Sequence, residues 1–391
     1  MGFDKPRSAD EDFDLLRNDA LIRWQRVLHI APKEGLGVVR RAISFALLTW
    51  LPLVVWAWMK HSLIDADSGE PLLAHFGIHV RCLVAIPLFI LAEAMSYKVI
   101  GQIVGQFRAS GAVAEDKYPA FLTVLKDVAR LRDSSLPWIF VISLTIAWTL
   151  GSPLDTDTHE MSWAMTSGSF GFGAWWFLYV ARPVFLLLLL GWLWRIALII
   201  LLFHRLSRME LSLVPTHPDR TGGLGFVKKL PSALFLVTLA VSSVIASRWM
   251  HEVVYHEQSL AALKLPFAAF VVLWSTLLLS PLLMLAPRIS AMKRQALLQY
   301  GALIGKQGRL VHQRWILGKS VPQNELLEAP ELGPVADTAT IYEAVKKISP
   351  LPVGKTTILM LLVPIFLPML FVIARQIPIR DLLLQLLKVV V

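Results

Sequence analysis

Three ionisable side chains lie inside long apolar segments, where a charge is costly unless it has a partner. They are Glu93, Arg182 and Arg195. The segment that holds both arginines is longer than a bilayer requires, so at least one arginine must lie within the hydrocarbon. Glu93 and Arg195 should reach a similar depth, because their two segments cross in the same direction. We predict that they pair, either lining a path for an ion or solute or holding two helices together.

A second polar group occupies residues 215–226, a loop that joins two apolar segments. Its ionisable and turn-forming residues are His217, Asp219, Arg220, Gly222, Gly223 and Gly225. The charged side chains could bind an anionic group or gate a pore mouth, and the glycines would let a ligand approach the backbone closely. The alternative is a tight structural turn in which Asp219 caps the next helix. The spacing does not match a dinucleotide-binding fingerprint.

Histidines that share loops with acidic residues form a third, weaker group of candidates. They are His75, His79, His251 and His256. His75 and His79 could share one helical face, whereas His251 and His256 would lie about 140° apart around a helix. That separation excludes the zinc motif of metalloproteases, which needs histidines four residues apart. Solvated loops give the same pattern by chance, and the chain has one cysteine. We therefore predict no metal and no cofactor.

Seven apolar segments are expected to position these groups. Each is about long enough to cross a 30 Å hydrocarbon layer: Ala42–Met59, Cys82–Tyr97, Leu136–Leu154, Ala174–Phe203, Leu230–Trp249, Leu265–Leu285 and Thr357–Ile373. The 391 residues are 55% hydrophobic and 17% charged, with a mean hydropathy of +0.59, unlike a soluble domain. Because lipid tolerates only structures with internally satisfied backbones, we predict an all-α, polytopic helical membrane protein of about seven transmembrane helices.

Charge alternates between successive loops. Residues 98–135, 204–229 and 286–356 are rich in Lys and Arg, whereas 60–80, 155–173 and 250–264 carry most of their charge as Asp and Glu. Since cytoplasmic loops carry the excess of Lys and Arg, we expect a multi-pass protein of the cytoplasmic (inner) membrane with a cytoplasmic N-terminus. The tail after Ile373 is both basic and apolar, so it either lies on the outer interface or returns inside as a hairpin.

The net charge of +10 lies beside the apolar segments, so membrane lipids are the expected partners and nucleic acid is not. A homo-oligomer is left open. We divide the chain into residues 1–37 with an amphipathic helix, a six-span bundle at 38–285, a cytoplasmic helical cap at 286–356, and a last span with an apolar tail at 357–391. The amphipathic helix would lie in the headgroup layer or pack on the protein's own loops.

Three functions fit these patterns. The first is conduction or transport of a small ion or solute, with a cation favoured because acidic outer loops would concentrate cations. The second is a non-enzymatic membrane sensor, effector or scaffold that acts through its cytoplasmic loops. The third is an enzyme acting on a lipid or membrane-embedded substrate at the 215–226 loop. Because no motif specifies a reaction, a non-enzymatic role is favoured over the third.

Overall fold

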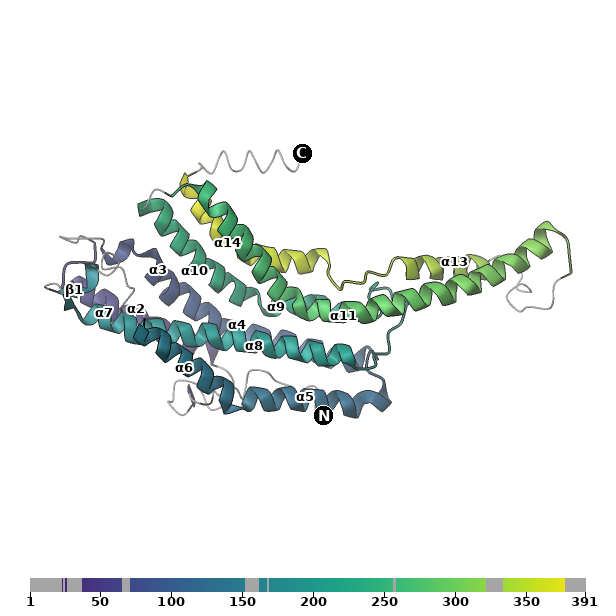
Figure 1. Cartoon of the computed structure of the whole chain (residues 1–391), viewed down its shortest axis with the longest axis horizontal. Coiled ribbons are helices and arrows are strands. Elements are labelled where there is room, and N and C mark those ends of the chain that lie inside the picture. The colour runs from purple at the N-terminus through teal and green to yellow at the C-terminus, as the bar shows by residue number, and fades with distance from the viewer. Residues whose placement is uncertain are drawn as a thin grey trace, which may run out of the picture.

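The computed structural model describes residues 37–64, 71–151, 162–166, 169–255, 258–320 and 333–376, together with Arg23, Gln25 and Arg26. Its long helices run side by side in one elongated bundle, from which a two-helix arm projects at one end (Figure 1). Apart from the two-residue strands β1 (Met165–Thr166) and β2 (Ser169–Phe170), the regular structure described is helical. The predicted all-α fold is therefore confirmed.

The described helices account for the seven apolar segments. Six helical stretches are long and apolar enough to cross a membrane, and a seventh is obtained if the bent pair Gly225–Ala233 and Phe235–Tyr255, which meet at 41°, is one span. The helices are α2 (Val38–Met59), α3 (Phe76–His79), α4 (Ile86–Ala109), α6 (Ser135–Gly151), α7 (Phe172–Trp176), α8 (Arg182–Arg208), α9 (Leu230–Ala233), α10 (Phe235–Tyr255), α11 (Leu260–Val311) and α14 (Lys355–Gln376). We call the end with the loops 60–80, 155–173 and 250–264 the acidic end, and the opposite end the basic end.

The exposure pattern of α2 indicates lipid as the solvent. Val39, Ile43, Leu47, Leu51 and Val55 form a stripe along one face, and their exposed fractions range from 44% to 61%. The opposite face is buried through Ala42, Ala46, Thr49, Leu53 and Ala57. A continuous exposed aliphatic stripe of this kind would be an aggregation site in water. In lipid the same stripe contacts acyl chains and needs no protein partner.

Two of the spans contain a wide helical turn immediately before a proline. The π-helical segments Val80–Ala85 and Phe177–Ala181 connect α3 to α4 and α7 to α8, and each precedes a proline near the start of the next helix. Proline lacks the amide hydrogen and crowds the preceding turn, and a π-bulge accommodates both problems without ending the helix. The π-helical turn before Arg182 and Pro183 is a bulge of this kind.

At the basic end the bundle continues into a core like that of a soluble protein. The helix α5 (Tyr118–Asp133) packs against α8, and Phe107 contacts Phe121, Phe203 and Phe226 at ring-centroid distances of 6.1, 6.5 and 4.9 Å. The chain turns between α4 and α5 at Gly111, whose φ of 71° suits glycine. Residues 98–135 thus comprise the end of α4 and the helix α5, with a break between them.

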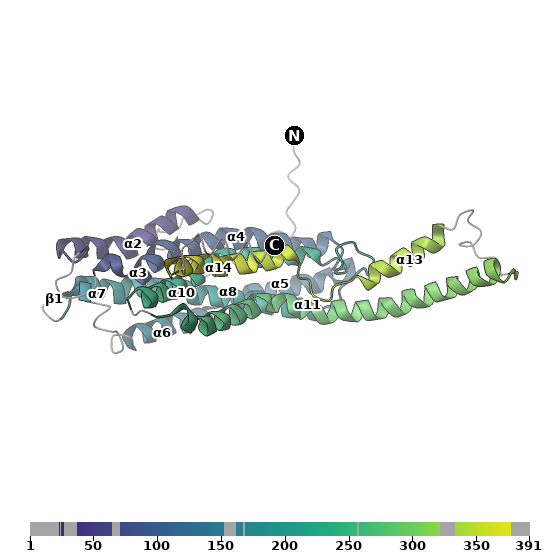
Figure 2. The same cartoon turned by 90° about the horizontal axis from the view of Figure 1, so that it is seen from above.

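The helix α11 carries on far beyond the bundle. Its 52 residues correspond to about 78 Å of helix, and a π-helical turn extends it to Ile316. The helix α13 (Gly333–Lys346) packs back along its outer part. Figure 2 shows that this pair forms an arm that extends away from the bundle. The arm belongs to residues 286–356, for which a helical cap is expected.

Candidate functional site

Glu93 is the centre of a buried ionic cluster. Its Oε2 atom lies 2.6 Å from Nη1 of Arg41, and its Oε1 atom lies 3.1 Å from Nη2 of Arg195. The side chains of Glu93 and Arg41 are 0% exposed, and that of Arg195 is 2% exposed. The predicted contact between Glu93 and Arg195 is thus present, and Arg41 joins it. One carboxylate links α2, α4 and α8.

Further polar contacts hold the two arginines in place. Nε of Arg41 donates a 2.6 Å hydrogen bond to Oε1 of Gln25. The guanidinium of Arg195 lies 5.0 Å from the ring centroid of Trp192, within the range of a cation–π contact. The Trp192 indole in turn donates to the carbonyl of Phe89, one turn before Glu93, at 2.9 Å. These contacts fix both guanidinium planes around the carboxylate.

The cluster lies at the level where α2 begins, well short of the basic end of α4 and α8. Arg41 is in the first turn of α2, whereas α4 continues from Glu93 to Ala109, about 24 Å further on. Arg182 is not part of the cluster, because it lies at the start of α8, about 20 Å along the helix from Arg195. Of the predicted intramembrane charges, the structure brings two together and leaves the third apart.

The N-terminal segment contributes to this region through two of its described residues. Gln25 is buried against Arg41, and Arg23 donates a 3.2 Å hydrogen bond to the carbonyl of Asp133, at the end of α5. At these two positions the segment packs on the protein itself. The rest of the predicted amphipathic helix lies outside the described residues.

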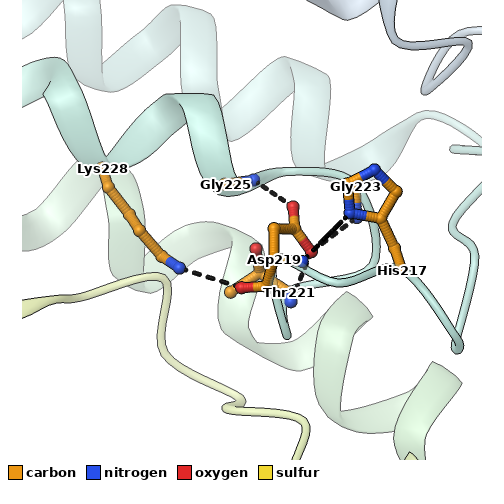
Figure 3. A network of polar contacts seen from close by, with 6 residues as sticks. All are labelled: His217, Asp219, Thr221, Gly223, Gly225 and Lys228. Carbon is orange, nitrogen blue, oxygen red and sulfur yellow. Dashed lines mark hydrogen bonds and ion pairs between the residues drawn. The ribbon is translucent and has the colours of Figure 1, made fainter. Parts of the chain in front are cut away.

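The 215–226 loop is organised around the carboxylate of Asp219 (Figure 3). Oδ1 accepts hydrogen bonds from the amides of Thr221 and Gly223 at 2.8 and 3.1 Å, and Oδ2 accepts one from the amide of Gly225 at 2.6 Å. Gly225 begins the 3₁₀ helix Gly225–Lys229. The Asp219 side chain therefore both closes the loop and caps the helix that follows it. This is the structural turn named above as the alternative to a ligand site.

The backbone amides also set the charge state of this carboxylate. Partial burial on its own would raise the pKa of Asp219, but the hydrogen bonds from Thr221, Gly223 and Gly225 outweigh it and lower that pKa below its ordinary value. Nδ1 of His217 lies 2.9 Å from Oδ1 of Asp219 and also 3.3 Å from the Asp219 amide. One nitrogen cannot serve both contacts, and the shorter one favours a proton on Nδ1 that points at the carboxylate.

Two glycines of the loop are required by close approach. A Cβ on Gly225 would lie 2.8 Å from Cβ of Asp219, and a Cβ on Gly222 would lie 2.9 Å from the Sδ atom of Met292 on α11. Gly222 also has a φ of 72°. The glycines predicted to admit a ligand to the backbone therefore admit a carboxylate and a helix of the same chain.

The 215–226 loop packs against the base of the arm. The Arg220 carbonyl accepts a 2.8 Å hydrogen bond from the amide of Ser349, and the ammonium of Lys293 on α11 donates to the carbonyl of Ile348 at 2.7 Å. Lys228 donates to the Asp219 carbonyl at 3.1 Å (Figure 3). The side chain of Arg220 itself is exposed. His217 and Asp219 thus contact each other within the loop, whereas Arg220 contributes its backbone carbonyl to the joint between loop and arm.

The histidines of the acidic end pack against aromatic and polar neighbours. His75 stacks on His251 with ring centroids 6.0 Å apart. Nδ1 of His79 accepts a 2.9 Å hydrogen bond from the Trp50 indole, and its Nε2 lies 3.0 Å from the carbonyl of Leu72. His79 therefore uses both ring nitrogens as a neutral imidazole. Among the residues described, no group of three or more His, Cys, Asp or Glu could hold a metal ion; His256 lies outside them.

Comparison with protein-family models, with curated proteins and with solved structures finds no match to this chain. The geometry alone carries the functional argument.

Sequence reasoning missed Arg41 because a basic residue at the edge of an apolar segment is typical of a cytoplasmic flank. No local pattern distinguishes Arg41, which is buried, from Arg40, which is exposed, because the burial depends on helices distant in sequence. Sequence reasoning also missed Lys228 and Lys293, because long-range contacts to backbone carbonyls leave no local pattern.

Proposed function

We propose that this protein is a membrane-anchored scaffold that holds the basic outer half of α11 away from the bilayer to bind an acidic protein partner. The observation that carries the proposal is the continuation of α11 from a membrane span into the arm, whose described residues are 290–320 and 333–346. From Ile289, which is buried at its base, the arm reaches about 40 Å further to Ile316. We also propose, from the basic loops, that the arm and the N-terminus are cytoplasmic.

Charge on the arm favours an acidic partner. The sequence holds no Asp or Glu from Leu260 to Ile316, so the outer half of α11 carries positive charge only. Lys306 and Arg309 are exposed there. Apolar side chains accompany them, with Leu298 76% exposed and Leu303 42% exposed. Positive charge around exposed apolar side chains is typical of a protein-binding surface rather than of a helix that is only solvated.

The base of the arm supports the same proposal, because a scaffold must present its binding surface in a fixed direction. Met292 and Lys293 of α11 contact the 215–226 loop and the segment before α14. Thr357, at the start of α14, donates a 3.1 Å hydrogen bond to the Lys228 carbonyl. The base of the arm is therefore tied to the 215–226 loop and to the segment before α14, and α14 is in turn tied to the 3₁₀ helix that follows the loop.

Photo-crosslinking in living cells tests the proposal. A photoreactive amino acid at Leu298 or Leu303 should give a discrete adduct larger than the monomer, whose captured protein is acidic. The same amino acid at Val272, which is 62% exposed on the membrane part of the same helix, should give no protein adduct. Reversing charge with Lys306→Glu and Arg309→Glu should weaken capture about tenfold or more, whereas Lys264→Glu, at the other end of α11, should not.

An adduct of twice the monomer mass would identify a second copy as the occupant and contradict an acidic partner. Equal capture by the wild type and the charge-reversed arm would contradict the electrostatic basis of the proposal.

Ion or solute transport is the second candidate, and the buried cluster of Glu93, Arg41 and Arg195 is the observation that favours it. Ionisable groups within membrane spans commonly mark ion paths. The exposed fractions of 0% and 2% mean that a path would require these helices to separate. An enzyme at the 215–226 loop has less support, because backbone amides occupy the carboxylate of Asp219.

A further inference from the structure

A pocket with both signs of charge opens near the acidic end, away from the arm and from the Glu93 cluster. Its volume is about 370 Å³, and it lies between the end of α10 and the first turns of α11. Among the described residues, its lining is formed by Arg248, Trp249, Glu252, Gln258 and Leu263.

The two charged side chains of this pocket do not neutralise each other. Arg248 and Glu252 are four residues apart on α10 and hence neighbours on its surface. Neither forms an ion pair with the other or with another described residue. Their order along the helix explains this in part, because the pairing is weaker when the basic residue precedes the acidic one. The described part of the pocket lining therefore presents one guanidinium and one carboxylate to a ligand.

The pocket lies at the depth of lipid headgroups. Arg248 follows Leu230, the first residue of α9, by 18 residues, which is about 27 Å of helix. A hydrocarbon layer of about 30 Å would thus place it close to the boundary at the acidic end. Trp249, whose ring lies 6.0 Å from that of Phe267, is the residue type typical of this boundary. Leu263 adds an apolar wall.

We propose that this pocket binds a zwitterion that carries a phosphate and a primary ammonium group, with the phosphate at Arg248 and the ammonium at Glu252. The planar guanidinium suits phosphate oxygens, and a primary ammonium can donate hydrogen bonds to the carboxylate. A quaternary ammonium has no such donor. The volume lies near the lower limit for small-molecule sites, which fits a headgroup rather than a whole lipid. The same chemistry occurs in phosphatidylethanolamine and in soluble glycerophosphoethanolamine.

Native mass spectrometry of the full chain with an equimolar mixture of phosphatidylethanolamine, phosphatidylcholine and phosphatidylglycerol tests the site. The wild type should retain phosphatidylethanolamine about tenfold over the other two. Arg248→Gln should remove this preference. Glu252→Gln should reverse it toward phosphatidylglycerol, because the guanidinium remains without the carboxylate; a purely structural role of Glu252 would give no such reversal. Lys264→Gln, which removes an exposed charge of the same end outside the pocket, should leave the preference unchanged.

The source of the ligand is distinguished by adding glycerophosphoethanolamine in detergent free of ethanolamine lipid. If it raises the melting temperature of the wild type but not of Glu252→Gln, the free zwitterion is a ligand; if only the lipid binds, the site is a lipid site. If Arg248→Gln fails to fold, Arg248→Lys together with Glu252→Gln provides the test. Equal retention of the three lipids, or an unchanged preference in Glu252→Gln, would overturn the proposal.

Discussion

Arg41 and Glu93 are 52 residues apart in the chain, and their side chains meet at 2.6 Å with no exposed surface on either. This contact joins α2 to α4, and the second contact of Glu93, with Arg195, adds α8. Burying such charges costs several kcal/mol of desolvation per ion, so a pair of this kind contributes little net stability. Removing one partner is different, because it leaves the other charge buried without its counter-ion.

Replacing Glu93 by Gln should therefore lower the free energy of unfolding by about 3–5 kcal/mol. The melting temperature in detergent measures the loss. A double-mutant cycle with Arg41→Gln should give a coupling free energy above about 1 kcal/mol. Glu343→Gln is the matched control, since it removes a carboxylate that is 53% exposed on the arm. Additive effects of the Arg41 and Glu93 changes would contradict the contact.

Ion flux distinguishes the two roles of this cluster. If the cluster only joins helices, then Glu93→Gln protein that still folds should give reconstituted vesicles with the same ion flux as the wild type. If the cluster lines a path, flux should change while the melting temperature falls. A changed flux would favour transport over the scaffold proposed above.

Acid should weaken the 215–226 loop specifically through Asp219. Because its folded pKa is lowered, its contribution to stability is present above the unfolded pKa of about 3.9 and is lost as pH falls through the lower folded value. Asp219→Asn should cost about 2 kcal/mol at pH 7, and the difference from the wild type should shrink toward pH 3. The pH dependence of this difference in stability can be measured by hydrogen exchange at the Thr221, Gly223 and Gly225 amides. Parallel pH profiles for the two proteins would count against the assigned hydrogen bonds.

Gly225 and Gly101 should respond in opposite ways to alanine. A Cβ on Gly225 meets Asp219 at 2.8 Å, whereas one on Gly101, inside α4, has no atom within 4 Å. Gly225→Ala should cost about 1–3 kcal/mol through overpacking, and Gly101→Ala should be neutral or stabilising by up to about 1 kcal/mol. Thermal unfolding of both variants provides the comparison. Equal melting temperatures would show that the loop can move aside.

Cysteine labelling tests the proposed orientation. Cys82 is 1% exposed and should not react with a charged maleimide, and Cys82→Ala can replace it if it does. Ile64→Cys and Leu298→Cys occupy sites 73% and 76% exposed at opposite ends of the molecule. In intact cells the reagent should label Ile64→Cys only, and Leu298→Cys should react after the membrane is opened. The reverse result would invert the proposed topology.

The sequence predicted the spans well, because an apolar stretch in lipid has essentially one way to satisfy its backbone. It also indicated the contact of Glu93 with Arg195, since a buried charge needs a partner at its own depth. Arg41 and Lys293 were not predictable in the same way, because their partners are chosen by the packing of helices distant in sequence. The arm was predicted to be helical but not to project from the bundle, because hydropathy does not indicate the direction in which a helix leaves the membrane.

The position of α14 sets an order for biogenesis. The last described span packs along α10, where Oγ of Ser242 donates to the carbonyl of Pro364 at 2.5 Å, yet the whole arm is encoded between them. During synthesis the ribosome must therefore complete α11 and α13 before the face of α10 can acquire its neighbour. Until then the Ser242 hydroxyl and its surroundings face lipid or an insertion factor, so the nascent chain passes through a six-helix intermediate with one open side.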